Sequence, residues 1–461
     1  MNWLQRYRVR HYIQDSLVVL PVTGIAAALI ITQSLSSIER RMGLVSSTLS
    51  GDAARLVIGT LAAAMLTFIV FLSSTLLVAV QLASAQLSPR VIAFVFRDPV
   101  TKGTLTVFVF TFTLSLAVLA RFDETVPLIT PKLATWGCVV SVCAFFYLID
   151  HVGKELRPSG VLKGIGATGS KVIESVYPRF LDQARQTPPA SFDFLNEEPA
   201  LTIANPRPGV VLAFDAKGLA SLARSSGCLI ELVPQVGDFV AAGDSLFRVF
   251  YNGESLSADR VCQCVAVGQE RTHEQDPALA FRIIVDIANK GLSPAINDPT
   301  TAVLAIDQIH HLLRSVGQRR LDEGVLRDER GRILLVYRTP DWEDFVQLAV
   351  TEIRQFGGSC IQIVRRLRAM LENLIETLPE ERTMLLCREL AVLQRTVERL
   401  FPEPEDRELA SVGDSQGVGG TNEWGNNRTP VSSSFHETKV SSLGSSFSTS
   451  VARERDPSKG L

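Results

Sequence analysis

The stretch LVIGTLAAAMLTFIVFLSSTLLVAV, residues 56–80, contains no charged side chain and is apolar along most of its length. A helix needs about 20 such residues to cross the ~30 Å hydrocarbon core of a bilayer. Three more runs of this kind lie in the first third of the chain, at roughly residues 16–35, 104–120 and 133–149. Residues 1–150 are therefore predicted to form a transmembrane domain of four helices.

The first run could be taken for a secretory signal. It is long for that role and no convincing small-x-small cleavage site follows it, so we interpret it as an uncleaved span. An even number of spans with a cytosolic N-terminus also places the C-terminus in the cytosol, and this arrangement puts more loop cations inside than outside, as expected. Inside lie Arg6, Arg8, Arg10, Arg90, Arg97, Lys102, Lys154, Arg157 and Lys163; outside lie Arg40, Arg41, Arg55, Arg121 and Lys132.

Polar residues form stripes on the second and third predicted spans, at heptad or similar helical spacing. One interpretation is a polar path through an oligomeric channel; the other is hydrogen bonding and close packing between helices. The four runs contain no Asp, Glu, Lys or Arg that could couple ions or protons, which argues against a secondary transporter. The candidate pore-lining residues are Thr60, Thr67, Ser74, Gln81, Thr111 and Ser115.

The composition of the 461 residues is balanced in charge, with a net charge of −2, and 46% of the residues are hydrophobic. No basic excess points to nucleic acid, so no nucleic-acid partner is expected. The seven cysteines are scattered without a CxxC pair. This indicates reduced thiols in a cytosolic compartment rather than a disulfide framework.

Four further regions follow the transmembrane domain. Residues 151–203 are predicted to be a charged juxtamembrane linker, and residues 204–270 a small β-rich domain. Within the latter, VPQVGDFVAAGDSLFRVF (233–250) has the glycine-turn rhythm of a small β-barrel of the biotinyl or lipoyl type. No lysine stands in an attachment-type turn there, so no cofactor is expected. Residues 271–402 form a helical α+β domain, and residues 403–461 a low-complexity, largely disordered tail, especially beyond about residue 420.

The helical α+β domain is predicted to hold two capped helices, then a strand at 332–337 and three helices at about 342–356, 360–376 and 380–401. Asp276-Pro277 and Asp298-Pro299 have the residues favoured at a helix N-cap and first turn. The charged face of the second late helix, with Arg365, Arg366 and Arg368, is expected to be solvated surface.

The stretch GLSPAINDPTTAVLAID, residues 291–307, joins the two capped helices and forms a helix–turn–helix corner. It could be purely structural. It could also bind an anion or an acidic partner, because free N–H groups and the helix dipole converge at a helix N-terminus. The candidate ligand-binding residues here and on the preceding helix are Arg282, Asp286, Asn289, Ser293, Asn297, Asp298, Thr300 and Thr301.

A metal site at this corner has weak support. Asp307 and His311 lie one turn apart and offer half a site, but metal sites in proteins usually have three or more protein ligands and no third group can be assigned. No metal site is therefore predicted. The chain also contains no nucleophile elbow, phosphate loop or zinc-hydrolase signature.

Several of these segments together resemble one family, the predicted bacterial membrane proteins known as domain of unknown function 2254. They are the four apolar runs, SPR at 88–90 with RD at 97–98, the long stretch GQERTHEQDPALAFRIIVDIANKGLSPAINDPTTAVLAID at 268–307, and ASVGDSQGVGG at 410–420. The resemblance covers roughly residues 5–420. It departs from the family pattern at Val100, Thr101 and Lys102, where the family has an arginine-rich run. It implies a bacterial inner-membrane protein and no particular activity.

The sequence thus predicts an α-helical four-span membrane domain followed by a cytosolic α+β body, made of a small β-barrel-like piece and a helical bundle. We expect a multi-pass protein of the bacterial inner membrane that is not an enzyme and serves as a membrane-anchored ligand-binding or regulatory module. The alternatives are an oligomeric channel and a metal-dependent enzyme. The expected partners are the lipid bilayer, further copies of the chain in a homo-oligomer, and a small ligand or protein.

Overall fold

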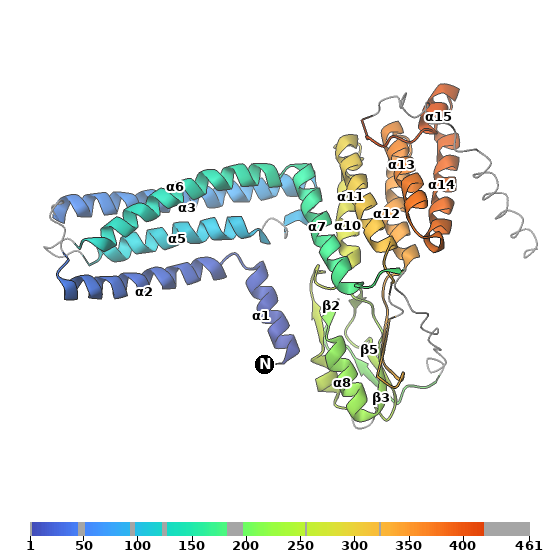
Figure 1. Cartoon of the computed structure of the whole chain (residues 1–461), viewed down its shortest axis with the longest axis horizontal. Coiled ribbons are helices and arrows are strands. Elements are labelled where there is room, and N and C mark those ends of the chain that lie inside the picture. Colours follow the sequence, from blue (N-terminus) through green and yellow to red (C-terminus); the bar gives the residue numbers. More distant parts are fainter. Residues whose placement is uncertain are drawn as a thin grey trace, which may run out of the picture.

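The computed structural model describes residues 2–44, 51–92, 97–121, 127–181, 197–253, 256–321 and 324–418. Figure 1 shows an elongated helical bundle at one end and a body at the other, in which a group of helices lies beside a β-rich part. The Pro188–Pro189 stretch and the tail that was predicted to be disordered beyond about residue 420 lie outside the described residues.

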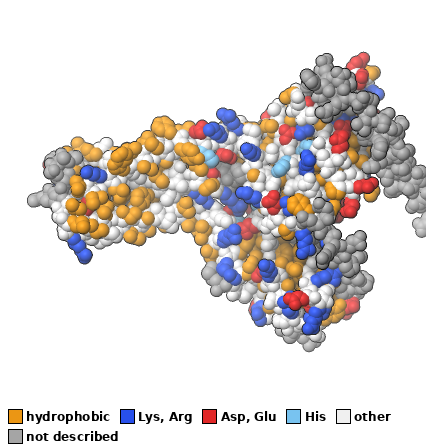
Figure 2. Space-filling model, viewed as in Figure 1, with side chains coloured by type: hydrophobic (Ala, Val, Ile, Leu, Met, Phe, Trp, Pro, Cys, Tyr) orange, Lys and Arg blue, Asp and Glu red, His pale blue; other side chains and the backbone are white. Residues whose placement is uncertain are grey.

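The elongated bundle consists of α2 (Val19–Met42), α3 (Gly51–Gln86), α5 (Pro99–Leu119) and α6 (Ile129–Glu155). All four are long and apolar enough to cross a membrane, which confirms the four predicted spans. Helix α5 packs against the other three and is the most buried, with 39% of its span inside the protein against 22% or less for the others. The outer surface is apolar, as Figure 2 shows, and exposes Phe71, Val78 and Phe146.

Polar groups inside the bundle are hydrogen-bonded. Glu39, near the end of α2, is buried and accepts bonds from the Thr130 amide and hydroxyl, both at 3.0 Å, so it caps the start of α6. Helices α5 and α6 approach closely at Gly137, where an added Cβ would lie 3.1 Å from Thr111 Oγ1. A small residue and a capped helix end are both ways of packing helices without leaving unpaired polar groups in hydrocarbon.

Helix α1 (Trp3–Asp15) lies outside the bundle and runs toward the β-rich part of the body (Figure 1). Asn2 Nδ2 donates to Gln263 Oε1 at 2.7 Å, and the Tyr7 hydroxyl lies 3.3 Å from Thr272 Oγ1. The N-terminal segment therefore contacts the body directly as well as leading into the first span.

The helical part of the body is formed by α7 (Pro158–Val176), α10 (Pro277–Gly291), α11 (Pro299–Gly317), α12 (Trp342–Gly357), α13 (Ile361–Thr377), α14 (Glu380–Leu400) and α15 (Pro404–Ala410). The first of these falls in the region predicted to be a linker. Helix α7 instead buries Ile165 and Ile173 in the same core as α10 and α11. It fits closely because an added Cβ at Gly169 would lie 2.6 Å from Ala280 Cβ.

The β-rich part contains β1 (Leu201–Ala204), β2 (Gly209–Phe214), α8 (Ala216–Ser226), β3 (Cys228–Leu232), β4 (Phe239–Val240), β5 (Ser245–Tyr251), α9 (Ala258–Cys262) and β6 (Val265–Gly268). Its strands form two sheets, β1-β5-β3-β8-β7 and β4-β2-β6, so the predicted barrel is not confirmed. Strands β7 (Val325–Arg327) and β8 (Ile333–Tyr337) come from within the predicted helical domain, and β8 pairs in parallel with β3.

The prediction that the arginines of α13 form a solvated face is wrong. Arg365, Arg366 and Arg368 are only 1%, 7% and 8% exposed. The closing segment 410–418 and α14 cover them, and Arg365 Nε donates to the Val412 carbonyl at 3.1 Å. Arginine is tolerated inside because each of these side chains has hydrogen-bond partners.

Candidate functional site

The predicted corner is built from local hydrogen bonds. Asp298 caps α11, because its Oδ1 accepts from the Thr301 amide at 3.1 Å and its Oδ2 from the Thr301 hydroxyl at 2.5 Å. Ser293 Oγ donates to the Lys290 carbonyl at 2.6 Å. Asn297 has φ 49°, a left-handed conformation that asparagine tolerates, and both it and Thr300 are exposed. The Asp298 carboxylate therefore occupies two donors, both on Thr301, that an anion at this helix end could otherwise use.

The other predicted ligand-binding residues, Arg282, Asp286 and Asn289, lie along α10 and form an ionic network instead of lining a pocket with the corner. Arg282 donates to the two carboxylate oxygens of Glu352 through Nη1 and Nη2, at 2.6 and 2.7 Å, and to Asp286 through Nε at 2.8 Å. Asn289 donates to the same Glu352 at 2.7 Å. The bidentate bond raises the pKa of Arg282 and lowers the pKa of Glu352.

This network extends to the membrane bundle, and we call the place where they meet the junction. Arg90, in the turn that follows α3, donates to Asp286 Oδ2 at 2.5 Å. Lys290 Nζ donates to the Ser84 carbonyl in the last turn of α3 at 2.9 Å. Two side chains of α10 thus bind the end of the second span, and in Figure 2 Lys and Arg side chains gather where the apolar bundle meets the body.

The predicted pore-lining residues fall into two environments. Thr60, Thr67, Ser74 and Gln81 lie on the exposed outside of α3, and the Thr60 and Thr67 hydroxyls bond to carbonyls of their own helix at 2.8 and 3.0 Å. In contrast, Thr111 and Ser115 are buried between α5 and its neighbours, where Ser141 Oγ donates to Thr111 Oγ1 at 3.1 Å. The two stripes do not face each other within one chain.

The weak metal candidates have other partners. Asp307 Oδ1 accepts from Arg366 Nε at 2.6 Å, and His311 Nε2 lies 3.2 Å from the Ser170 hydroxyl. Across the described residues, no group of three His, Cys, Asp or Glu side chains is placed to hold a metal ion.

The junction contains a cavity of about 760 Å³, which we call the junction cavity. The membrane side supplies two arginines, and the body supplies an arginine and a histidine from the stretch GQERTHEQDP. A smaller cavity of about 280 Å³ lies between helix α7 and the ends of α5 and α6 nearest the body, and both cavities are lined by Arg97 and His273. The junction cavity is lined by Pro89, Arg90, Ile92, Arg97, Val210, Gln269, Glu270, Arg271, His273, Leu279 and Ile283.

Carboxylates fix the arginines of the junction cavity. Arg97 Nε donates to Asp15 Oδ1 at 2.5 Å, and Arg271 Nε donates to Asp276 Oδ2 at 2.7 Å. Asp276 is buried and also caps α10 by accepting from the Leu279 amide at 3.0 Å. Burial raises the pKa of Asp276, although its bond from Arg271 opposes the rise.

Gly237 makes room for Arg271. An added Cβ at Gly237 would lie 2.5 Å from Arg271 Nη2, and the residue has φ +97°, which L side chains rarely adopt. The glycine that the sequence pattern assigned to a barrel turn therefore also accommodates an arginine of the junction cavity.

Two histidines line the cavities. Burial, reinforced by the nearby Arg97 charge, lowers the pKa of His273 to about 4, so the imidazole is neutral at pH 7. Its Nδ1 is buried and has no hydrogen-bond partner among the described residues. His151 Nε2 lies 3.1 Å from Asp98 Oδ1 in the smaller cavity. Burial alone raises the pKa of Asp98, but bonds from Thr101 and His151 outweigh it and hold that pKa below its usual value.

Arg97, Arg271 and His273 were not among the site residues predicted from the sequence. The available signal was the density of charged and polar residues in GQERTHEQDP, directly before a capped helix, and the RD pair at 97–98. Neither stretch shows by itself that the two meet, because 169 residues lie between them and only the tertiary packing brings them together.

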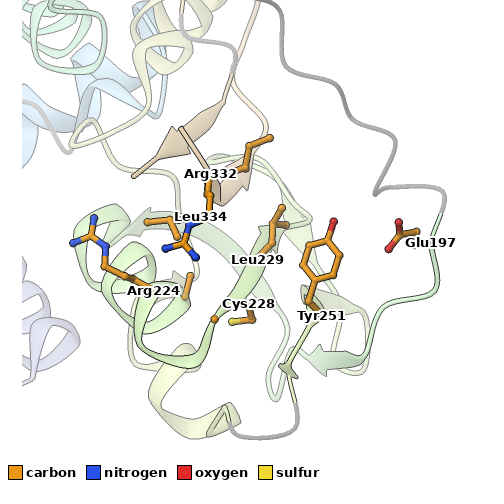
Figure 3. A pocket seen from close by; sticks show the side chains of 10 residues that line it. Glu197, Arg224, Cys228, Leu229, Tyr251, Arg332 and Leu334 are labelled. Atoms are coloured by element: carbon orange, nitrogen blue, oxygen red, sulfur yellow. The ribbon is translucent and has the colours of Figure 1, made fainter. Parts of the chain in front are cut away.

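A further cavity, of about 430 Å³, lies in the β-rich part (Figure 3). Arg224 approaches it from α8, and Tyr251, which has φ 71°, lies across from it beside Leu229. Burial raises the pKa of the Cys228 thiol in its wall, which keeps the sulfur protonated and a poor nucleophile. All of the described residues that line this cavity lie between Glu197 and Leu334, outside the bundle.

Comparison with known proteins supports the membrane assignment. A family described as "Predicted membrane protein (DUF2254)" matches residues 14–373. The chain is 27% identical over 428 residues to the uncharacterized protein Mb1321c of Mycobacterium bovis, with 88% of this chain and 80% of the relative covered. It has the same identity and coverage with the uncharacterized protein Rv1290c of Mycobacterium tuberculosis. No solved structure matches the chain.

Proposed function

The chain belongs to the DUF2254 family of predicted membrane proteins, and we propose that it is a membrane-anchored binding and regulatory module whose ligand occupies the junction cavity. The observation that carries the proposal is the composition of that cavity. Arg90 and Arg97 reach it from the membrane side, and Arg271 and His273 reach it from the body. A molecule bound there contacts both halves of the protein. The proposal assigns no catalytic step to the chain.

A regulatory role is supported by the way the halves are tied together. The bonds from Arg90 to Asp286 and from Lys290 to the Ser84 carbonyl link α10 to the end of α3. Helix α1 adds a second link through Tyr7 and Thr272. A ligand changes a conformational equilibrium only if it interacts differently with the two states. A cavity lined by both halves meets this requirement, because its shape depends on how they sit together.

Native mass spectrometry of the purified full chain tests the binding role. We expect a bound molecule to copurify and to be lost when Arg97→Gln and Arg271→Gln are combined. The matched control combines Arg395→Gln and Arg399→Gln, two exposed arginines of α14 far along the chain from the junction. If the bound molecule persists in the junction variant, or if none copurifies with the native protein, the proposal is wrong.

The proposal places the body and both termini in the cytosol of a bacterial cell. The excess of basic residues in the loops on the N-terminal side supports this orientation. All seven cysteines are free, which suits a reducing compartment. In a cysteine-free background, a cysteine at Ser47 should react with an impermeant thiol reagent in spheroplasts, and one at Ser170 should react only after lysis. The reverse pattern would place the body outside.

A further inference from the structure

We infer that the junction cavity binds the phosphate-bearing headgroup of a membrane lipid. This inference rests on the proposed function and names the chemical class of its ligand. It is carried by three properties of the cavity, which are its anchored arginines, its apolar wall and its position at the end of the spans.

The arginines are held in place before any ligand arrives. Within the described part of the chain, Arg97 and Arg271 each engage a carboxylate through Nε. Arg90 uses Nη1 for Asp286. A guanidinium has five N–H donors, so each arginine keeps donors for a second anion. Arginine is the side chain best suited to phosphate, because two parallel N–H groups match two phosphate oxygens. The neutral His273 can accept or donate a hydrogen bond without adding charge.

The remaining wall suits the part of a lipid next to its phosphate. Ile92, Leu279 and Ile283 line the same cavity as the arginines. A free inorganic anion gains nothing from such a surface, whereas the glycerol and upper acyl region of a lipid buries apolar area against it.

The position favours the bilayer as the source. Helix α3 ends at Gln86 and α5 begins at Pro99, and the cavity residues Pro89, Arg90 and Arg97 lie between these two points. Lipid headgroups occupy the depth at which the spans end. Basic pockets at the cytoplasmic ends of membrane helices are suited to anionic headgroups.

Glu270 is the one carboxylate among the described residues that line the junction cavity. It disfavours a bare anion and favours a headgroup that carries a hydrogen-bond donor beyond its phosphate. Glycerol and ethanolamine headgroups have such donors, and choline has none. Phosphatidylglycerol and phosphatidylethanolamine should therefore bind better than phosphatidylcholine.

The test uses the full chain in detergent, stripped of copurifying lipid and kept in phosphate-free buffer. Each of the three lipids, and separately inorganic phosphate, is titrated while bound lipid is counted by native mass spectrometry and the thermal midpoint is followed. A ligand that binds only the folded state raises the midpoint. We expect saturable binding of phosphatidylglycerol and phosphatidylethanolamine, and binding at least tenfold weaker with Arg97→Gln and Arg271→Gln combined.

Three controls keep the test decisive. The Arg395→Gln and Arg399→Gln protein should bind lipid as the native protein does. Arg97→Lys with Arg271→Lys keeps both charges, so it should fold even if the glutamine variant does not, and should bind with intermediate strength because lysine lacks the planar fork. Glu270→Gln should reduce the preference over phosphatidylcholine.

The outcomes separate the sources of phosphate and the two proposals. Protection by inorganic phosphate without lipid binding would overturn the lipid source and retain the phosphate chemistry. Lipid binding that neither arginine variant weakens would overturn the inference. If a molecule without phosphate copurifies and is lost in the arginine variant, the proposed function stands and the lipid inference fails. If nothing is lost, both fail.

Discussion

The chain uses the same four-residue cap, Asp-Pro-x-Thr, at the start of α5 and at the start of α11. In both, the aspartate accepts hydrogen bonds from the amide and the hydroxyl of the threonine three residues later. At α11, each of the two carboxylate oxygens of Asp298 accepts one of these bonds. At α5, both bonds fall on Oδ2 of Asp98, and Oδ1 is left for His151 at 3.1 Å.

This difference shows that the local sequence defines a helix cap, whereas the surroundings of the cap decide whether the capping residue also belongs to a site. The cap of α11 lies beside the exposed Asn297 and Thr300. The cap of α5 lines a cavity, and a third cap, Asp276 at α10, holds an arginine of the junction cavity. Two caps thus also position side chains at the junction, and the corner cap stabilises its own helix. The following predictions test this contrast.

The largest effect is expected at Asp276. Asp276→Ala removes the cap of α10 and leaves Arg271 without its carboxylate, in a site where Asp276 is 2% exposed. Loss of a cap costs about 1 kcal/mol, and an uncompensated, partly buried charge adds about 2 kcal/mol. Hydrogen exchange at the first amides of α10 measures the loss. Asp276→Asn, which keeps an oxygen acceptor for the cap, should cost less. An equal loss in both variants would show that the cap contributes little.

Acidic pH should weaken the junction more than the corner. Because the pKa of His273 is lowered to about 4, the unfolded chain binds a proton below pH 6.5 that the folded chain does not. Stability therefore falls as pH drops through this window, by about 2 kcal/mol between pH 7 and pH 5. The thermal midpoint of the native protein at both pH values gives the slope.

His273→Gln should remove this part of the slope. Burial also lowers the pKa of His310, a partly buried residue of α11 that is bonded to Asn373 at 2.9 Å, so His310→Gln is the matched comparison. A slope that His273→Gln leaves unchanged would mean that the junction does not sense pH through this side chain.

The two Asp-Pro caps should respond differently to serine. Asp298→Ala should cost about 1 kcal/mol, and Asp298→Ser should largely restore stability because serine is a good N-cap. Asp98→Ala should likewise remove the cap of α5, and Asp98→Ser should restore only part of the lost stability, since a hydroxyl that caps α5 no longer holds His151. Thermal midpoints of the four single variants, two at each cap, provide the measurement. Equal rescue by serine at both positions would erase the distinction.

The smallest effect concerns hydroxyl side chains in two environments of the bundle. Thr67 and Ser74 are exposed on α3, so Thr67→Val with Ser74→Ala should change the stability of one chain by no more than about 0.6 kcal/mol per bond. Thr111→Val, which removes the buried bond from Ser141, is the contrasting variant. Flux through reconstituted vesicles and native mass spectrometry of the oligomer complete the test. Lower flux in the α3 variant with an intact oligomer would favour the channel alternative.

Sequence reasoning was most successful where structure depends on neighbouring residues. The four spans, the caps at Asp276 and Asp298, and the helices of the last third all follow from apolar runs and N-cap residues. Strand β8 was also predicted within one residue of its bounds. These features require no knowledge of distant contacts.

The rest depended on contacts between distant segments. Residues 158–176 do carry a local signal, since Val161, Ile165 and Ile173 lie on one face of a helix that begins at a proline, but only the packing against α10 and α11 buries that face. Arg365, Arg366 and Arg368 look like a solvated face until the closing segment covers them. The junction cavity was missed for the same reason, since its arginines come from residues 90, 97 and 271.

The parallel pairing of β8 with β3 has a consequence for synthesis on the ribosome. Leu334 and Leu335 belong to the hydrophobic core of the β-rich part, so this part cannot be completed until residue 337 has left the exit tunnel. By then α10 and α11 have already been made, and the larger sheet still consists of β1, β5 and β3, with one edge of β3 uncovered. An uncovered edge strand can pair with a neighbouring nascent chain. Slow translation before residue 337 emerges from the tunnel should therefore promote aggregation of this protein more than slow translation after it has emerged.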